Sequence, residues 1–477
     1  MNPLADLLLA QGRRAPGRTW VEQPDGRTWT YADLDHASAS MAHVLTELGV
    51  GPGDRVGVQA EKSVELLALH VACVRAGAVY VPMNTAYTPT EVSALVADAE
   101  PALLVRDASL PGGDRAVPLA DLVAASSGRP SSFDDVDRGA DDPAAMLFTS
   151  GTTGRPKAAV LSHANLVASA RTLMSAWELT ATDVLVHMLP LFHTHGLFVA
   201  AHTATVAGAR IVLLAAFSPD AVIDALPGAT VLMGVPTHYV RLLAEPRLTA
   251  EPCARMRLFT SGSAPMLLAT HQEFTARTGH VIVERYGMTE TCMLTSNPLH
   301  GERRVGTVGP ALPGVEVRVD GSPGAVEVRG PNVFGGYWHR PDADAEAFTD
   351  DGWFRTGDLG ELDADGYLRL VGRSKDLVIT GGLNVYPKEV EEVLDALPGV
   401  LESAVVGIPD PDLGEAVTAA VVARPGADLD PDSLRLLARE RLAGFKVPKR
   451  VVVLPELPRN AMGKVEKALL RQQLGSL

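Results

Sequence analysis

Residues 149–157 of the 477-residue chain read TSGTTGRPK. It follows the strand-like run AAMLF and precedes LSHANL, which is typical of a helix start. Its hydroxyl and N–H groups can converge on phosphate oxygens, and its lysine adds a positive charge. The Gly-Lys-Ser/Thr ending of a Walker loop is missing, so an ordinary Ser/Thr/Gly turn is the alternative to a phosphate-binding loop of another class. The candidate phosphate contacts are Thr149, Ser150, Gly151, Thr152, Thr153, Gly154 and Lys157.

Around this loop, helix-like and strand-like patterns alternate. Residues 30–48 place apolar side chains at helical spacing, residues 54–60 are strand-like, and residues 63–76 are again helix-like. Strand-like runs recur at IVLLAAF from Ile211 and at TVLMGVP from Thr230. Repeated β-α-β alternation predicts mostly parallel sheets with helices packed on their faces.

The pattern changes from Val305 onward. Short β segments between Gly/Pro turns predict a small antiparallel β unit, and the last hundred or so residues mix helix-like and strand-like runs. We therefore expect an α/β protein whose large N-terminal domain, residues 1–371, has mostly parallel sheets with helices plus the small β unit. A hinge at residues 372–376 would lead to a smaller, mobile α+β C-terminal domain, residues 377–477. The hinge segment could equally be an ordinary surface turn.

Composition narrows the class of protein. Hydrophobic residues make up 46% and charged residues 21% of the chain, as in ordinary globular proteins. The net charge of −15 argues against nucleic acid or an anionic membrane as the main partner. Three scattered cysteines form neither a disulfide framework nor a metal cluster. Because charges or turn residues interrupt every apolar run and the N-terminus lacks a leader pattern, a soluble cytoplasmic enzyme is expected.

Four further motifs follow the loop in chain order. They are YGMTE at residues 286–290, WFRTGDLG at 353–360, GRSKD at 372–376 with the later Gly381-Gly382, and PRNAMGK at 458–464. Any one alone would be weak evidence, since short motifs recur by chance. All five together, in register over nearly the whole chain, resemble the adenylate-forming superfamily. That superfamily comprises acyl-CoA synthetases, aryl-CoA ligases, luciferases and the adenylation domains of peptide synthetases.

The resemblance implies a two-step reaction that uses ATP, Mg²⁺ and coenzyme A. A carboxylate attacks the α-phosphate of ATP to give acyl-AMP and pyrophosphate, and the thiol of coenzyme A then displaces AMP. Both partners of the first step are anions, so catalysis rests on charge compensation and positioning. Glu290 would hold Mg²⁺, and Thr289 would touch the α-phosphate. Outside the motif, Glu290 would be interpreted as a solvated acid at a helix start.

The resemblance also implies a nucleotide site. Tyr286 would offer a flat face to adenine, beside the backbone of Gly262, Ser263 and Ala264, and Asp358 and Arg373 would bind the ribose. The alternatives are a half-buried core aromatic for Tyr286, a Thr-Gly-Asp turn for Asp358 and an ordinary surface arginine for Arg373. Besides the residues of the phosphate loop, the expected ATP-binding set is Gly262, Ser263, Ala264, Glu284, Arg285, Tyr286, Gly287, Met288, Thr289, Asp358, Arg373 and Lys464.

Lys464 is the expected catalytic cation, which would bridge carboxylate and α-phosphate oxygens. The resemblance puts the pivot of a mobile module at Lys375 and the coenzyme A contacts at Lys375, Gly381 and Gly382. It also allows acetylation of Lys464 by a lysine acetyltransferase, with a deacetylase reversing it. Outside its motif, a lysine near a C-terminus would be interpreted as a solvated charge.

The choice of acid depends on Arg285, which directly precedes YGMTE. An arginine beside the reacting centre implies a second carboxylate on the substrate, and an ion pair with Glu284 is the alternative. His193, in PLFHTHG, is more consistent with a side chain beside the acyl group than with a metal ligand. The expected substrate contacts are His193, Met233, Ser263 and Arg285.

Several stretches, among them YVPMNTAYT and LPLFHTHGLFVA, are similar to malonyl-CoA synthetases from about residue 28 to 470. Malonate is therefore the first expected substrate and methylmalonate the second. Two alternatives stay open: a ligase for another short acid, and an adenylating protein that loads a carrier without coenzyme A.

Overall fold

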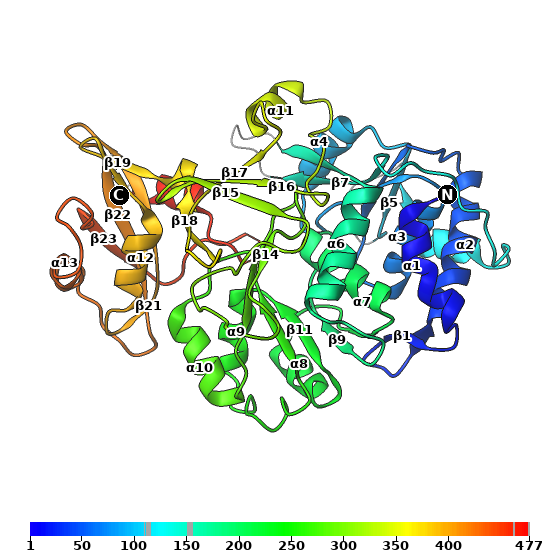
Figure 1. Cartoon of the computed structure of the whole chain (residues 1–477), viewed down its shortest axis with the longest axis horizontal. Helices are drawn as coiled ribbons and strands as arrows, with labels where there is room; N and C mark the ends of the chain where they lie inside the picture. The colour runs from blue at the N-terminus through cyan, green and yellow to red at the C-terminus, as the bar shows by residue number, and fades with distance from the viewer. Residues whose placement is uncertain (109, 111–115, 150–155, 461–462, 476–477) are drawn as a thin grey trace. The chain divides into compact units, whose positions relative to one another are not determined.

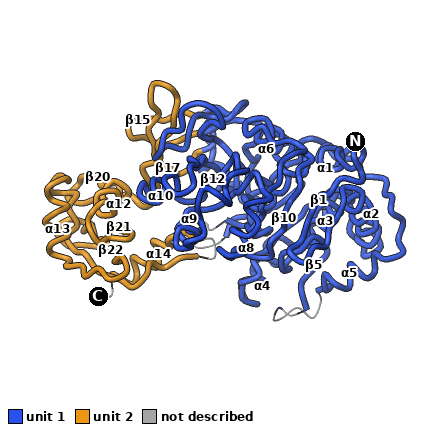
Figure 2. Tube along the Cα trace, turned by 90° about the horizontal axis from the view of Figure 1, so that it is seen from below, with its two compact units in different colours: residues 1–316, 328–354 blue, residues 317–327, 355–477 orange. Residues whose placement is uncertain are grey.

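The computed structural model describes residues 1–477 except 109, 111–115, 150–155, 461–462 and 476–477 (Figure 1). The chain divides into two compact units (Figure 2). The first comprises residues 1–316 and 328–354, and the second residues 317–327 and 355–477. The predicted hinge at residues 372–376 stays a prediction, because compactness alone does not locate a pivot.

The larger sheet of the first unit has the strand order β14-β13-β12-β11-β9-β10-β1-β2. Its strands pair in parallel except for β14 and β2 at the two edges. The bounds are β1 (Thr19–Glu22), β2 (Thr28–Thr30), β9 (Val184–His187), β10 (Arg210–Leu213), β11 (Val231–Gly234), β12 (Leu258–Ser261), β13 (Val283–Tyr286) and β14 (Thr295–Ser296).

The second sheet has the order β6-β5-β3-β4-β7-β8 and is parallel except for the last pair. Its strands are β3 (Arg55–Gln59), β4 (Val79–Pro82), β5 (Leu103–Arg106), β6 (Val117–Pro118), β7 (Pro143–Thr149) and β8 (Lys157–Ser162). Thr149 pairs with Lys157 across β7 and β8, so the first and last residues of the predicted phosphate loop are strand partners. The helix start predicted at LSHANL is confirmed, but strand β8 precedes it and was not expected.

Helices accompany these sheets, and several begin at a side chain that caps the first turn. Asn2, Thr30, Ser63, Thr88 and Ser162 each accept a hydrogen bond from a backbone N–H in the first turn, which satisfies a group that the helix itself cannot. The helices are α1 (Pro3–Arg14), α2 (Tyr31–Glu47), α3 (Val64–Arg75), α4 (Pro89–Ala99), α5 (Leu119–Ser126), α6 (His163–Ala176), π-helix η1 (His195–Ala201), α7 (His202–Ala207), α8 (Pro219–Ala225), the 3₁₀ turn η2 (Leu226–Gly228), α9 (Pro236–Leu243), α10 (Leu268–Thr278) and α11 (Pro341–Ala347).

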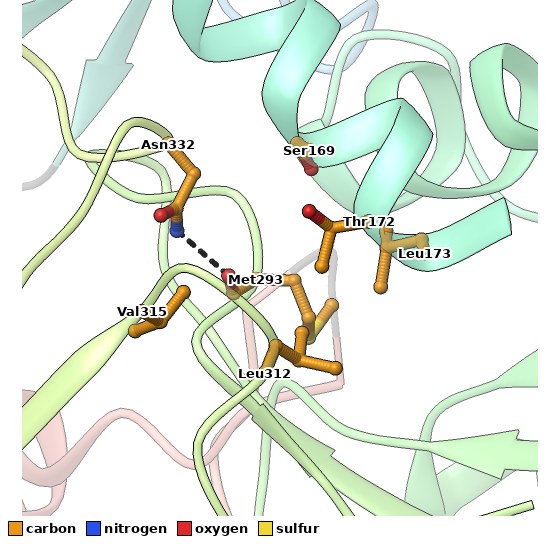
Figure 3. Close-up of a pocket in the computed structure, with 7 residues that line it drawn as sticks. All are labelled: Ser169, Thr172, Leu173, Met293, Leu312, Val315 and Asn332. Carbon is orange, nitrogen blue, oxygen red and sulfur yellow. Dashed lines mark hydrogen bonds between the residues drawn. The ribbon is translucent and has the colours of Figure 1, made fainter. Parts of the chain in front are cut away.

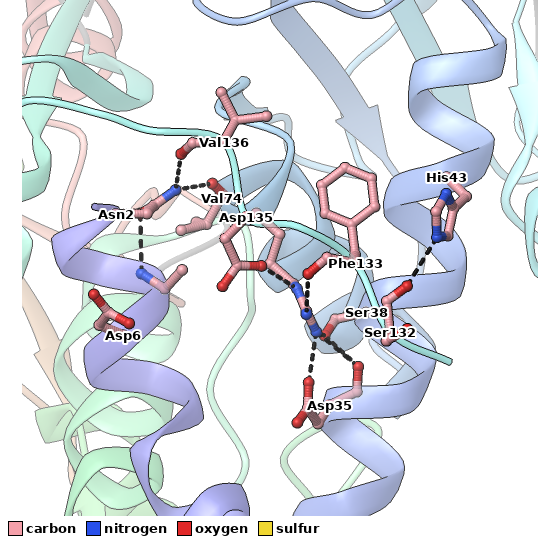
Figure 4. Close-up of polar contacts among 12 residues, drawn as sticks. Asn2, Asp6, Asp35, Ser38, His43, Val74, Ser132, Phe133, Asp135 and Val136 are labelled. Carbon is pink, nitrogen blue, oxygen red and sulfur yellow. Dashed lines mark hydrogen bonds and ion pairs between the residues drawn. The ribbon is translucent and has the colours of Figure 1, made fainter. Parts of the chain in front are cut away.

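A buried arginine at the end of α3 ties the N-terminal helices together. Arg75 Nε donates to Asp135 at 2.6 Å, and its Nη1 donates to Asp35 of α2 at 2.6 Å (Figure 4). Asn2, the cap of α1, donates to the carbonyl oxygen of Val74 at 2.7 Å. Both carboxylates compensate the guanidinium, so this charge is no candidate for an unfilled anion site.

Two further sheets are formed by strands that follow those of the large sheets in the sequence. The four-stranded sheet has the order β15-β16-β17-β18, and its strands are β15 (Glu316–Gly321), β16 (Gly324–Arg329), β17 (Phe354–Leu362) and β18 (Leu368–Arg373). In the five-stranded sheet, β20-β19-β22-β21 is the order and β23 pairs with β22. Its strands are β19 (Val378–Thr380), β20 (Leu383–Val385), β21 (Val400–Asp410), β22 (Gly414–Ala423) and β23 (Arg450–Leu454). The helices of the same part of the chain are η3 (Ser374–Asp376), α12 (Pro387–Asp395), α13 (Pro431–Arg439) and α14 (Lys467–Gly475).

Alternation along the long strands gives the five-stranded sheet two apolar faces. Val405 of β21 and the alternate residues Val417, Ala419 and Val421 of β22 pack with α12 and α13. On the other face, Ala404 and Val406 pack with Leu470 and Leu474 of α14. The predicted class, mostly parallel sheets with helices and a smaller α+β domain, is confirmed. Among the residues that the structure describes, no helix is long and apolar enough to cross a membrane.

Candidate active site

The carboxyl ends of β11, β12 and β13 bring several predicted residues to one edge of the large sheet. Met233 on β11 lies opposite Thr260 on β12, and Ser261 lies opposite Glu284 on β13. In sheets of this kind, ligands bind outside the carboxyl ends of the strands. The loop that follows β12 begins at Gly262, which packs against Arg285. A Cβ atom on Gly262 would lie 2.8 Å from the carbonyl oxygen of Arg285 and 2.5 Å from its Nη1, so glycine is required for this close approach.

Arg285 is only 4% exposed and lies against His195 of η1. Its Nη2 donates to Nε2 of His195, and because arginine only donates, the imidazole accepts there and carries its proton on Nδ1. Burial and then the charge of Arg285 lower the pKa of His195, which keeps the ring neutral. Burial lowers the pKa of Arg285 to about 9, which leaves the guanidinium charged at neutral pH.

The pair leaves two buried donors without a partner among the described residues. They are Nε–H of Arg285 and Nδ1–H of His195. A buried donor without an acceptor is costly, and a buried charge without a counter-charge is more so. The geometry therefore fits a ligand that brings an anionic acceptor.

Glu284 does not serve as the counter-charge. Alternation along β13 turns its side chain away from that of Arg285, and its Oε1 accepts a hydrogen bond from the backbone of Gly306 at 3.0 Å. No carboxylate of the described chain forms an ion pair with Arg285, so the alternative of an Arg285–Glu284 pair is wrong.

His193 is half-buried and contacts the backbone of His195. Its Nδ1 accepts a hydrogen bond from the backbone N–H of His195 at 3.2 Å. The sequence predicts His193 beside the acyl group, whereas the ring that contacts Arg285 belongs to His195, for which the sequence indicates no role. Within the described ranges, no group of three or more His, Cys, Asp or Glu residues is placed to hold a metal ion.

Lys62 is a second cation that sequence analysis missed. It is half-buried, its Nζ donates to the carbonyl oxygen of His187 at 2.8 Å, and burial lowers its pKa. Burial and then the charge of Lys62 lower the pKa of His187 to about 3, so this histidine is neutral. A lysine just before a helix cap carries no signal that would identify such a contact.

Glu290 lies at the end of YGMTE, is 5% exposed and is held by a tyrosine. The hydroxyl of Tyr337 donates to Oε1 of Glu290 at 2.9 Å. Burial and then Glu290 raise the pKa of Tyr337, so the phenol keeps its proton. The ammonium of Lys157 lies 5.3 Å from the centre of the same ring. A fixed carboxylate near a lysine fits Mg²⁺ bound to phosphates, because this ion usually takes one or two protein carboxylates and keeps phosphate and water ligands.

Only the ends of the phosphate loop are described. The hydroxyl of Thr149 donates to the carbonyl oxygen of Lys157 at 3.2 Å and closes the hairpin. Ser150, Gly151, Thr152, Thr153 and Gly154 lie outside the described residues.

The other expected nucleotide contacts of the first unit surround the same sheet edge. Tyr286 is buried, while Gly287, Met288 and Thr289 are half-buried in the loop that follows β13. Ser263 and Ala264 are half-buried after β12, and Ser263 has a φ of 69°.

In the second unit, Asp358 on β17 pairs with Arg373 on β18. The two residues are opposite in register, and Nε of Arg373 lies 2.9 Å from Oδ1 of Asp358. Asp358 is buried and also donates its backbone N–H to Thr356 Oγ1 at 3.1 Å. Thr-Gly-Asp therefore belongs to a strand, and its interpretation as a turn is wrong.

Lys464 lies in the field of this pair. Burial, followed by Arg373, lowers the pKa of Lys464 to about 8, and Asp358 opposes the shift. The turn that carries the lysine is closed by Arg459, whose Nη1 donates to the carbonyl oxygen of Gly463 at 2.6 Å and whose Nη2 pairs with Glu402.

The residues expected to contact coenzyme A lie in exposed turns of the second unit. Lys375 is exposed in η3, and Gly381 and Gly382 form the turn between β19 and β20 with φ values of 57° and 76°. Those angles favour glycine.

Comparisons with known proteins agree with this architecture. Residues 8–338 match the family described as AMP-binding enzyme, and residues 389–464 match the AMP-binding enzyme C-terminal domain. The solved structure of ATP-bound MatB from Rhodopseudomonas palustris is similar over 100% of this chain and 99% of its own, with 48% identity and a TM-score of 0.94.

Curated relatives act on different acids. A feruloyl-CoA synthase from Amycolatopsis sp is 36% identical over 98% of both chains. A malonate–CoA ligase from Arabidopsis thaliana is 33% identical over 94% of this chain and 85% of its own. The chain belongs to the AMP-binding enzyme family, as its five motifs predicted, and it is an acid–CoA ligase that uses ATP, Mg²⁺ and coenzyme A.

Proposed function

We propose that the protein ligates malonate to coenzyme A through malonyl-AMP, with methylmalonate as a second substrate. The observation that carries the proposal is the buried pair of Arg285 and His195, which has two donors with no acceptor among the described residues and therefore calls for an anion. A monocarboxylic or aromatic acid would leave this charge uncompensated once its own carboxylate is at the reacting centre. The second carboxylate of malonate supplies the acceptor. Met233 and Ser263 would line the remainder of the acyl site, with His193 beside them.

The chemistry follows from charge. In the first step, one carboxylate oxygen of malonate bonds to the α-phosphorus of ATP, and the bond to the leaving pyrophosphate breaks. In the second step, the thiol of coenzyme A gives up its proton to solvent, its sulfur bonds to the acyl carbon, and AMP leaves with the electron pair of the broken bond. We assign to Lys464 and Thr289 the compensation of charge at the α-phosphate, and to Lys157 the other phosphates.

Magnesium would be held by Glu290 and would neutralise phosphate charge. We assign adenine to Tyr286 and the ribose to Asp358 and Arg373. The remaining members of the predicted ATP set would contribute backbone contacts.

Two proposals concern the second unit. Lys375, Gly381 and Gly382 would contact coenzyme A, and residues 372–376 would be the hinge that separates the two half-reactions. A lysine acetyltransferase and deacetylase would control Lys464, because an amine with a pKa of about 8 is partly unprotonated and nucleophilic at neutral pH.

An assay of AMP release tests the substrate. Purified protein with ATP, Mg²⁺ and coenzyme A is given malonate, methylmalonate, acetate, butyrate or ferulate separately, and the thioester is identified by mass spectrometry. We expect malonate to give the highest kcat/KM, by at least about tenfold over the monoacids, since one lost charge pairing exceeds 1.4 kcal/mol. Two results would contradict the proposal. One is multiple-turnover release of AMP without coenzyme A, and the other is AMP release that is fastest with ferulate.

A further inference from the structure

The loop between β13 and β14, which carries Glu290, contains a strained residue. Cys292 has a φ of 52°, in the left-handed region that a side chain disfavours. The carbonyl oxygen of Cys292 lies against Gly287, where an added Cβ would be only 2.1 Å away. The loop is therefore closed tightly on itself, and something must hold Cys292 in this conformation.

Asn332 forms hydrogen bonds with the backbone on both sides of Cys292. Its Nδ2 donates to the carbonyl oxygens of Thr291 and Met293, at 2.8 Å each. Figure 3 shows the bond to Met293 beside a small cavity whose lining includes Leu312 and Asn332. Since carbonyl oxygens only accept, the amide can be oriented in only one way. Thr291 and Asn332 are buried, so no bulk water replaces these bonds.

The segment that carries Asn332 is itself anchored and continues to Glu290. Asn165 of α6 donates to the carbonyl oxygens of Pro331 and Val333, at 2.9 Å each. Beyond them, the backbone N–H of Phe334 donates to the carbonyl oxygen of Glu290 at 2.8 Å, and Tyr337 holds its carboxylate. Residues 331–337 therefore hold Glu290 in place through Phe334 and Tyr337. Asn332, in the same segment, holds residues 291–293, which follow Glu290.

We propose that Asn332 is a positioning residue that holds Cys292 in its left-handed conformation and thereby places Glu290 for Mg²⁺ in the Mg²⁺–ATP complex. The inference rests on the proposed role of Glu290 as the magnesium ligand. A strained backbone conformation such as that of Cys292 persists only where surrounding contacts hold it in place. The two hydrogen bonds from the amide of Asn332 supply those contacts. Partners behind a metal ligand commonly change metal affinity by 10- to 100-fold when they are removed.

Direct binding of Mn²⁺, a spectroscopic substitute for Mg²⁺, tests the inference without turnover. Electron paramagnetic resonance measures free Mn²⁺ in the presence of the protein and α,β-methylene ATP. We expect Asn332→Ala to raise the Kd of Mn²⁺ about tenfold. Adding Cys292→Gly should restore affinity to within about threefold of wild type, because glycine adopts positive φ without strain.

Two matched variants separate this mechanism from simple loss of packing. Adding Cys292→Ala to Asn332→Ala removes the same thiol but keeps the strained Cβ, so the affinity should stay low. Leu312→Ala opens the same cavity without removing the hydrogen bonds of Asn332, so its Kd should equal that of wild type although urea unfolding shows a loss of stability.

Equal rescue by Cys292→Gly and Cys292→Ala, or a normal Kd for Asn332→Ala, would overturn the inference. Failure of the proposed function is recognised separately. If Glu290→Gln in the otherwise unchanged protein leaves Mn²⁺ binding at the wild-type level, Glu290 is not the metal ligand and the premise itself fails.

Discussion

Replacing Lys464 by alanine is expected to lower the rate of malonyl-AMP formation at least about 100-fold, while thioester formation from supplied malonyl-AMP persists. The first step joins two anions, and one well-placed cation in such a transition state is worth two to three powers of ten, roughly. The second step has a neutral thiol or thiolate attacking an activated ester and needs no cation at that position. Single-turnover measurements with labelled ATP and, separately, with synthetic malonyl-AMP give the two rates. Equal loss in both would contradict the division of roles.

The pKa of Lys464 sets an upper pH limit for the adenylation step. Burial and Arg373 lower the pKa of Lys464 to about 8, so its ammonium is lost as the pH rises through that value. Adenylation should therefore fall above about pH 8, whereas an unperturbed lysine would hold its charge to about pH 10. In Lys464→Arg, whatever rate remains should not fall as the pH rises through about 8, because the introduced arginine stays protonated there. A profile that is flat from pH 7 to 10 in wild type would show that Lys464 does not carry the required charge.

Replacing Arg285 by alanine is expected to lower kcat/KM for malonate at least about 100-fold and to leave butyrate unchanged or improved. The variant leaves the second carboxylate of malonate desolvated without a partner, and breaking a buried ion pair typically costs about 3–5 kcal/mol. Butyrate has no second charge, and it gains when an uncompensated guanidinium is removed. Wild type and variant measured with both acids give a cycle of four rates.

Two controls sharpen that cycle. Arg285→Lys keeps the charge but loses the planar fork and the contact with His195, so it should lie between wild type and Arg285→Ala with malonate. Glu284→Gln, on the opposite face of β13, should retain the ratio of malonate to butyrate. If malonate and butyrate fall together in Arg285→Ala, the arginine supports the fold rather than the second carboxylate.

The sheets were predictable because their residues are contiguous and periodic. Runs such as TVLMGVP and IVLLAAF form β11 and β10 in a mostly parallel sheet, as their apolar character and spacing predicted. Strand β8 was missed because its residues KAAVLS lie between a glycine-rich loop and a helix cap, where the helix start dominated the pattern.

Candidate site residues could be proposed from the sequence only where they stand in or beside one of the five motifs. Glu290 and Arg285 stand in or beside YGMTE, and Asp358 and Arg373 stand in two motifs that the sheet register brings together. By contrast, His195 meets Arg285 across 90 positions, and Asn332 meets Thr291 across 41. Long-range hydrogen bonds of this kind depend on how the loops pack, and no local pattern in PLFHTHG or GPNVFGG encodes them.

Competition between acids measures directly whether the protein selects malonate. Wild-type protein receives equal concentrations of malonate, butyrate and ferulate with ATP and Mg²⁺ and a limiting amount of coenzyme A, and the thioesters are quantified by mass spectrometry. Because competing substrates divide in the ratio of their kcat/KM values, the product ratio reports selectivity alone. The account predicts that malonyl-CoA exceeds each of the other thioesters by at least about tenfold. A product dominated by butyryl-CoA or feruloyl-CoA would contradict it.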